Sequence, residues 1–363
     1  MIVMNIYLPE KNQLSVDFHT AIYPNAVKPL PARSLHLRRT TMPRHYSKGK
    51  LDMSILQKTA EHCKNWNRWG PDDEAGTLNF VSPEDIIKAA SLIRKGKVFS
   101  LALNFDNQGP QKGLWGNRFN PIHTMLATGT DAVAGNQDEG RFRFADDMVS
   151  LPLQCGTQWD ALGHIFYEDK MWNGYDAKLV DANGAKKNGI EKVKDRFVGR
   201  GILLDVAKHV GVESLEPGMA ITNSDLDETA EAQEVEIRRG DFVIVRTGMM
   251  GQCLSAGEWG DYAGGDAPGM AFETAEWIHK KEIAAICCDT WGCEVRPNET
   301  EEAQQPWHWV VIPRIGISMG EIFVVDHLAT DCAEDGVYEF FFCAPPLPIT
   351  GGVGSPLNPI AIK

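Results

Sequence analysis

The segment from Gln154 to His164 carries four polar side chains at a spacing that could bring them together in a catalytic site. It reads Gln-Cys-Gly-Thr-Gln-Trp-Asp-Ala-Leu-Gly-His. In an extended chain, side chains two residues apart point to the same side, so Gln154, Gln158 and Asp160 would share one face. A turn could then fold His164 back over that face. An aspartate beside a histidine can move protons, so the spacing predicts a site at a strand end. A structural histidine with satisfied hydrogen bonds is the alternative interpretation of His164.

This segment resembles the H-x-G-T-H-x-D-x-x-x-H signature of the cyclase family, which includes the bacterial kynurenine formamidases (arylformamidases) and the isatin hydrolases. Supporting stretches lie at 65–70, 118–123, 240–248 and 316–321. Residues 345–356 are similar to the long-chain branch of that family. The resemblance covers residues 66–363. It implies an α/β fold, a swivelling β/β/α domain in which helices cover a mixed sheet. It also implies a homo-oligomer, a dimer or tetramer, whose neighbouring subunit partly walls the site.

The resemblance further implies a metal site, but with two substitutions. In the formamidases the two signature histidines and the aspartate bind metal, and the last histidine is a candidate acid and base. Gln154 and Gln158 stand here where those two histidines belong, whereas Asp160 and His164 match the signature. His308 and Glu321 resemble the further ligands that the formamidases draw from downstream.

The two glutamines weaken the case for a two-metal centre. A glutamine carbonyl binds zinc less well than imidazole does, although Mn²⁺, Mg²⁺ and Ca²⁺ tolerate it. Asp160, His308 and Glu321 could still hold one divalent metal, Mn²⁺ or Zn²⁺, with Gln158 and Gln154 as weak additional ligands. Such an ion would lower the pKa of a bound water and polarise a carbonyl group.

We therefore expect a metal-assisted hydrolase that cleaves an amide, cyclic amide or lactone bond of a small aromatic substrate, with His164 and Asp160 as catalytic residues. Two alternatives remain. One is a metal-independent lyase or cyclase that uses Asp160 and His164. The other is a catalytically idle homologue that binds a small molecule, in which the two glutamines mark decay of the site.

Several other residues are candidates for the substrate pocket. His123 follows Asn120-Pro121 and could line it, or could be a structural histidine. Trp159 and Trp69 could wall an aromatic site, although buried tryptophans often belong to the core. Asp289 and Glu294 flank Trp291 after an apolar strand, a place where α/β proteins often carry site residues; loop capping is the alternative.

The elements that must position these residues alternate along the chain. Ser82-Pro83-Glu84-Asp85 has the pattern of a helix N-cap with proline at the first position, and Gly96 offers a stop. Apolar runs predict strands at 98–103, 202–206, 242–247 and 284–288, and helices are expected over 225–237 and 270–281. Continuous apolar strands that alternate with helices favour a sheet with parallel strands.

Composition limits the partners. The chain has 363 residues and a net charge of −13, which disfavours nucleic acid as a partner. The uncharged stretch 340–362 is too rich in proline to span a membrane. We expect a cytoplasmic protein with a small-molecule substrate and no membrane partner. The eight cysteines form no C-x-x-C pair and are expected to be mostly buried, reduced thiols.

The charge is unevenly distributed. Residues 1–50 hold eight basic and two acidic residues, a net +6, which leaves −19 on the remainder. With its prolines and without sustained periodicity, this segment predicts a basic, extended N-terminal arm over residues 1–65. The alternative is an upstream extension ahead of a start at Met53. The cyclase-like catalytic domain is expected over 66–363.

Overall fold

The computed structural model describes residues 51–137 and 140–363, which all belong to one compact unit. Residues 1–50 of the predicted basic arm therefore lie outside the described residues. Helix α1 (Met53–His62) places Leu56 and Ala60 in the main hydrophobic core. The folded unit thus begins before the predicted boundary at residue 66, because the short apolar face of this helix packs on the core like the later elements.

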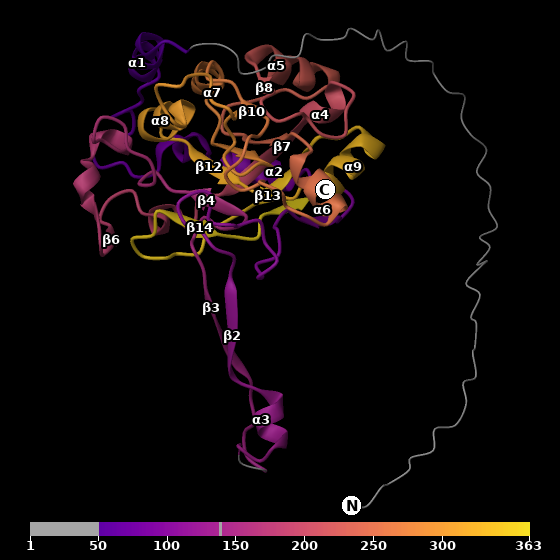
Figure 1. Cartoon of the computed structure of the whole chain (residues 1–363). Coiled ribbons are helices and arrows are strands. Elements are labelled where there is room, and N and C mark those ends of the chain that lie inside the picture. The colour runs from indigo at the N-terminus through magenta and orange to yellow at the C-terminus, as the bar shows by residue number, and fades with distance from the viewer. Residues whose placement is uncertain (1–50, 138–139) are drawn as a thin grey trace, which may run out of the picture. The chain divides into compact units, whose positions relative to one another are not determined.

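Within the described residues, a nine-stranded mixed sheet forms the centre of the fold, in the order β1-β15-β13-β7-β9-β11-β12-β4-β14 (Figure 1). Strands β7, β9, β11 and β12 are parallel to one another, and the strands on both sides of them are antiparallel. The expected α/β fold with a mixed sheet is confirmed. The sheet strands are β1 (Val98–Ser100), β4 (Gln158–Asp160), β7 (Val198–Asp205), β9 (Phe242–Arg246), β11 (Ala285–Cys288), β12 (Ser318–Glu321), β13 (Glu339–Cys343), β14 (Gly354–Pro356) and β15 (Ile360–Ile362).

The parallel strands are buried on both faces, as their apolar runs predict. In β9, Val243 and Val245 join one hydrophobic core, while Phe242 and Ile244 join the other. Cys287 and Cys288 in β11 likewise face opposite cores. The predicted strands at 202–206, 242–247 and 284–288 are confirmed, whereas the first, expected over 98–103, extends only to Ser100.

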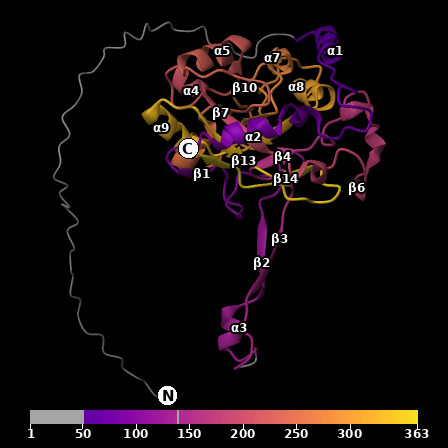
Figure 2. The ribbon, with the colours of Figure 1, turned by 180° about the vertical axis from the view of Figure 1, so that it is seen from behind.

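Helices cover both faces of the sheet. Helix α2 begins with the predicted capping box between Ser82 and Asp85, and packs on β7 and β13 (Figure 2). The helices expected over 225–237 and 270–281 are present but shorter. The α-helices after α1 are α2 (Pro83–Ala90), α3 (Gly129–Val133), α4 (Val206–His209), α5 (Asn223–Ala232), α6 (Met249–Ala256), α7 (Thr274–Lys281), α8 (Pro306–Val310) and α9 (Asp326–Asp335). Short 3₁₀ or π turns are η1 (Gly76–Phe80), η2 (Trp172–Gly174), η3 (Ala177–Leu179), η4 (Ile190–Val193) and η5 (Val311–Ile315).

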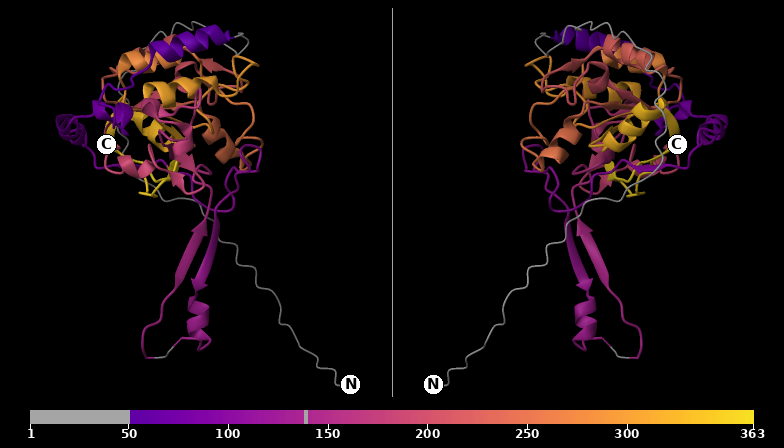
Figure 3. Two further views of the ribbon diagram at one scale, coloured as in Figure 1. Left: turned by 90° about the vertical axis from the view of Figure 1, so that its left-hand side faces the viewer. Right: turned by 90° about the vertical axis from the view of Figure 1, so that its right-hand side faces the viewer.

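Smaller two-stranded pairs lie outside the main sheet. They are β2 (Ile122–Ala127) with β3 (Asp146–Ser150), β5 (Val180–Asp181) with β6 (Gly184–Ala185), and β8 (Ala220–Ile221) with β10 (Gly269–Met270). The antiparallel ribbon of β2 and β3 extends from the sheet and carries α3 at its far end (Figure 3). Nearly all of its strand residues are exposed.

The expectation of mostly buried, reduced cysteines holds except for one pair. Cys288 and Cys293 form a disulfide with a Cα–Cα distance of 5.6 Å, because the chain turns back on itself after β11. The other six cysteines are free thiols and mostly buried, as predicted. In the part of the chain that the structure describes, no helix is long and apolar enough to cross a membrane.

A substitution of Gly320, in β12, would test how tightly side chains pack against this sheet. A Cβ atom at Gly320 would lie 2.8 Å from each of Cys287 Sγ, a Phe323 ring carbon and a Trp159 ring carbon. Because these neighbours are fully buried, they cannot move aside without disturbing the core. We expect Gly320→Ala to lower the free energy of unfolding by about 1–3 kcal/mol, measured by urea denaturation.

Gly129 is the matched control. It begins α3, and a Cβ atom there would meet nothing within 4 Å. Gly129→Ala should change the free energy of unfolding by less than about 0.5 kcal/mol. Equal effects of the two substitutions would show that the packing around Gly320 is loose.

Candidate active site

Strand β4 positions the two polar residues of the motif that reach the site. It lies between β12 and β14, and Gln158 pairs with Glu321 across to β12. Since side chains directly opposite or two residues apart share a face, Gln158, Asp160 and Glu321 point to the same side of the sheet. Trp159 points to the other side, where it stacks on Phe197. The predicted common face of Gln158 and Asp160 is thus confirmed.

Gln154 does not belong to this strand. Residues 151–157 form turns between β3 and β4, not the continuous strand that the alternation predicted. The Nε2 atom of Gln154 is buried without a hydrogen-bond partner, and the side chain lies against Gly354 of β14. Gln154 therefore makes no hydrogen bond to the carboxylates of Asp160 and Glu321.

A hydrogen-bonded cluster joins the three side chains on the common face. The Gln158 amide nitrogen donates to Glu321 Oε2 at 2.7 Å and to Asp160 Oδ1 at 3.4 Å. Gln158 Oε1 is buried without a partner. The opposite orientation of the amide would set this oxygen against two carboxylates, so the bridging orientation is the favourable one.

Helix α8 brings His308 to the same cluster. His308 Nε2 lies 3.6 Å from Glu321 Oε1, and Nδ1 lies 2.8 Å from Glu294 Oε2. The Glu294 carboxylate also accepts the backbone N–H groups of Trp307 and His308 at the start of α8. Glu294 thus both orients the histidine and caps the start of α8, and it does not itself line the cavity.

These contacts shift the pKa values of the cluster. Burial alone would lower the pKa of His308, but the hydrogen bonds and charges of Glu294 and Glu321 outweigh it and raise the pKa to about 9. Burial, with the nearby charge of Asp160, raises the pKa of Glu321. His308 therefore carries a positive charge at neutral pH.

His164 lies at the edge of the same cluster, four residues after Asp160. Its Nε2 is 3.8 Å from Asp160 Oδ1, and its side chain is 20% exposed, whereas that of Asp160 is 2% exposed. Burial lowers the pKa of His164 despite the opposing charge of Asp160. A neutral imidazole beside a carboxylate can accept a proton.

A cavity of about 240 Å³ opens onto these groups. Its polar wall is formed by Arg118, Asp160, His164, His308 and Glu321, together with Gln304 and Gln305, and its aromatic wall by Trp115, Trp291 and Trp309. The cavity therefore combines charged groups with flat aromatic rings, as expected for a site that binds a small molecule.

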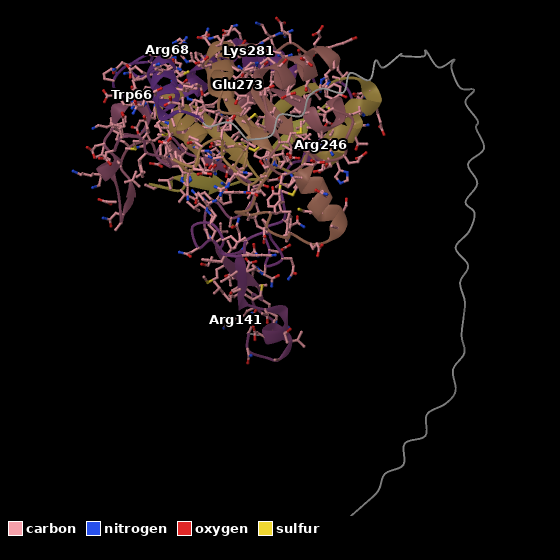
Figure 4. All side chains as sticks on the ribbon, turned by 45° about the horizontal axis from the view of Figure 1, so that its top comes forward. Trp66, Arg68, Arg141, Arg246, Glu273 and Lys281 are labelled. Atoms are coloured by element: carbon pink, nitrogen blue, oxygen red, sulfur yellow. A yellow bond between two sulfur atoms is a disulfide. The ribbon has the colours of Figure 1, made fainter. Side chains whose placement is uncertain are left out.

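Two hollows of about 630 and 920 Å³ are both lined by Arg246, which lies on another part of the molecule (Figure 4). Their central charges are already paired, since Arg246 contacts both Asp205 and Asp326 at 2.9 Å. Asp289, the other residue considered beside Trp291, accepts the N–H groups of Thr247 and Gly248. It caps a loop and does not line the cavity.

The sequence predicted the wrong aromatic residues for the cavity. Trp159 is 0% exposed and donates its indole N–H to Ala344, so it belongs to the core. Trp69 packs against Phe80 and Trp172. His123 lies on the exposed ribbon, where its Nε2 is 2.7 Å from Asp147 Oδ2. Periodicity and spacing do not reveal Trp115, Trp309 and Arg118, which come from loops and from α8.

The predicted ligands Asp160, His308 and Glu321 meet at the cavity, but their donors are engaged with one another. A divalent ion needs oxygen or imidazole lone pairs directed at it. Here the Gln158 N–H groups point at both carboxylates, and His308 Nε2 lies 3.6 Å from Glu321 Oε1. Among the described residues, no group of three or more His, Cys, Asp or Glu side chains is arranged to hold a metal ion. This donor set does not fit the expected Mn²⁺ or Zn²⁺ centre.

Gln158→Leu tests whether the carboxamide holds the cluster. Without its N–H groups, Asp160 and Glu321 would face each other as buried, uncompensated acceptors. We expect a loss of about 1–3 kcal/mol in the free energy of unfolding, measured by urea denaturation.

Gln154→Leu is the matched control from the same motif, because the Gln154 Nε2 already lacks a partner. It should cost clearly less than Gln158→Leu. If the two variants are equally destabilised, the bridging role of Gln158 is refuted.

Comparison with known proteins agrees with this architecture. A family model described as Putative cyclase matches residues 43–295. A crystal structure of a novel cyclase is 39% identical, covering 83% of this chain and 99% of that chain, with a TM-score of 0.76. Isatin hydrolase A from Ralstonia solanacearum is 17% identical, covering 74% of this chain and 92% of its own, with a TM-score of 0.54.

An isatin hydrolase bound to the product analogue thioisatinate is 18% identical, covering 77% of this chain and 98% of its own, with a TM-score of 0.55. At these identities the two isatin hydrolases show a shared fold alone. A search of the curated proteins found no match.

Proposed function

We propose a function on the premise that the chain belongs to the cyclase family, as the family match and the 39% identical crystal structure establish. The chain is a hydrolase that cleaves the C–N or C–O bond of an amide, cyclic amide or lactone in a small, flat substrate. The observation that carries this proposal is the Asp160–His164 pair, 3.8 Å apart at the wall of a cavity with an aromatic side.

The proposed reaction begins at His164. Asp160 faces Nε2 of the imidazole and favours the tautomer with its proton there, which leaves Nδ1 to accept a proton from water. The water oxygen then attacks the substrate carbonyl carbon, and His164 returns the proton to the departing nitrogen or oxygen. The 3.8 Å separation is longer than a hydrogen bond, which is common before substrate closes the site.

His308 supplies the charge that this reaction needs. Carbonyl attack places negative charge on the carbonyl oxygen, and a fixed positive group nearby lowers the energy of that state. Glu294 holds the His308 ring in place at 2.8 Å. No step of this scheme requires a metal, and the donor set of the cavity does not favour one.

His164→Ala should lower kcat by about 10²–10⁴-fold, because it removes the group that activates water. The measurement is a screen of N-formyl arylamines, cyclic imides and lactones, each with chelator and with added Mn²⁺ or Zn²⁺. His209→Ala, at the end of α4 and outside the cavity, is the control and should leave kcat unchanged.

The same screen separates the alternatives. We expect turnover that survives a chelator. Activity that is lost on chelation and restored by metal would contradict the metal-free scheme. An unchanged rate in His164→Ala would remove the assignment of the base. A product of ring closure or elimination would indicate a lyase or cyclase. Binding of a compound without turnover would indicate a catalytically idle homologue.

We also propose that the chain forms a homo-oligomer through the β2–β3 ribbon. The cross-strand pairs Ile122–Ser150 and Thr124–Met148 share one face of the ribbon. These four side chains carry no charge, and Ile122 is 55% and Met148 50% exposed. A two-stranded ribbon has no core of its own, so an apolar face on it favours burial against another surface.

A second copy of the chain fits this face best. Residues 51–363 carry a net charge of −19, so two copies would meet most easily through an uncharged patch. Two identical faces can also pack about a two-fold axis. The strands carry no Lys or Arg with which to hold nucleic acid or acidic lipid.

The double variant Ile122→Glu, Met148→Glu should dissociate the oligomer, because it buries four like charges at the two-fold contact. Light scattering after gel filtration measures the mass. The control is Met125→Glu, Val149→Glu on the opposite face of the ribbon, which should keep the wild-type mass. A monomeric wild-type protein, or an unchanged mass in the first variant, contradicts the proposal.

A further inference from the structure

Arg118 is a cation at the cavity wall without a carboxylate partner. The Nη1 atom of its guanidinium group donates a long hydrogen bond, of 3.4 Å, to the backbone oxygen of Gln154. Across residues 51–137 and 140–363, no carboxylate lies within ion-pair distance of it. By contrast, Arg200 is paired with Asp241 at 2.8 Å. A guanidinium has five N–H donors in a planar fork, so most of the donors of Arg118 remain available.

The carboxylates of the cavity lie deeper than Arg118. Asp160 is 1% and Glu321 3% exposed, while Arg118 and Trp115 are half-buried. The N–H groups of Gln158 bridge both carboxylates, and His308 Nε2 lies 3.6 Å from Glu321 Oε1. A ligand that enters the cavity therefore meets the uncompensated positive charge of Arg118 at the rim, before the compensated carboxylates at the floor.

The wall beside Arg118 is aromatic. The rings of Trp115 and Trp291 lie 5.3 Å apart at 52°, and the Arg296 guanidinium lies 5.4 Å from each of them. This contact fixes two of the three tryptophans that line the cavity. With a volume of about 240 Å³, the cavity suits a single flat ring with a few substituents.

We propose that Arg118 selects substrates by binding an anionic group, a carboxylate on a flat aromatic body. The inference rests on the proposed function and narrows its substrate class. The carboxylate pairs side-on with two N–H groups of Arg118, and the ring lies against the tryptophans. The carbonyl group whose C–N or C–O bond is cleaved then lies next to His164 and Asp160. Arg118 is a specificity residue in this arrangement and takes no part in proton transfer.

Equilibrium dialysis of radiolabelled benzoate and benzamide tests this assignment without turnover. The two probes have the same shape and differ in charge. Wild-type protein should bind benzoate at least about ten-fold more tightly than benzamide, because charge-assisted hydrogen bonds are the stronger kind. Arg118→Gln should abolish that preference while it retains benzamide binding. Arg118→Lys should keep part of the preference, since it keeps the charge and loses the fork.

Arg94→Gln, an exposed arginine outside the cavity, is the control and should preserve the wild-type preference. Equal binding of the two probes, binding of neither, or a preference that survives in Arg118→Gln would overturn the proposal. The result is distinct from that of the substrate screen. Hydrolysis without a benzoate preference refutes this inference alone, and a benzoate preference without hydrolysis refutes the proposed function alone.

Discussion

Two carboxylates, Asp160 and Glu321, are buried side by side at the end of the central sheet, and like charges in such a place need compensation. The Gln158 carboxamide supplies part of it through N–H groups directed at both. His308 supplies the rest, because Glu294 holds the imidazole at 2.8 Å on its other side. Each of the two carboxylates thus has a hydrogen-bond or charge partner among the site's own side chains. His164, whose imidazole is neutral, and Arg118, which has no carboxylate partner, line the cavity around these buried groups.

The arrangement depends on strand register. Gln158 and Glu321 are opposite each other in β4 and β12. A slip of β4 by one residue would turn Trp159 to the cavity and Gln158 and Asp160 into the core. Gly320 allows the Trp159 ring to approach β12, and that ring lies in the core on the other face of the sheet. The packing of Trp159 on one face of the sheet therefore fixes the positions of Gln158 and Asp160 on the other face. This coupling explains why a short three-residue strand can hold two site residues in place.

Much of the fold follows from the sequence, because its strongest signals are local. The apolar strands β7, β9 and β11 and the capped helix α2 are visible as runs and caps, and the pair Gln158 and Asp160 follows from the alternation of a strand. The resemblance to the cyclase family identified His308 and Glu321, more than 140 residues away. The rest depends on tertiary contacts. Trp159 and Trp69 are indistinguishable in sequence from Trp291 and Trp309. Arg118 begins the family stretch 118–123, but nothing in that stretch assigns its side chain to the cavity. The role of Glu294 appears only when α8 folds against it.

The most direct test of a metal-free, amide-bridged site is a crystal structure with anomalous diffraction measured above the zinc and manganese absorption edges. The account predicts no anomalous peak between Asp160 and Glu321, with continuous density for the Gln158 side chain between the two carboxylates. A peak within bonding distance of Asp160, Glu321 and His308, with the Gln158 oxygen turned toward it, would contradict the account.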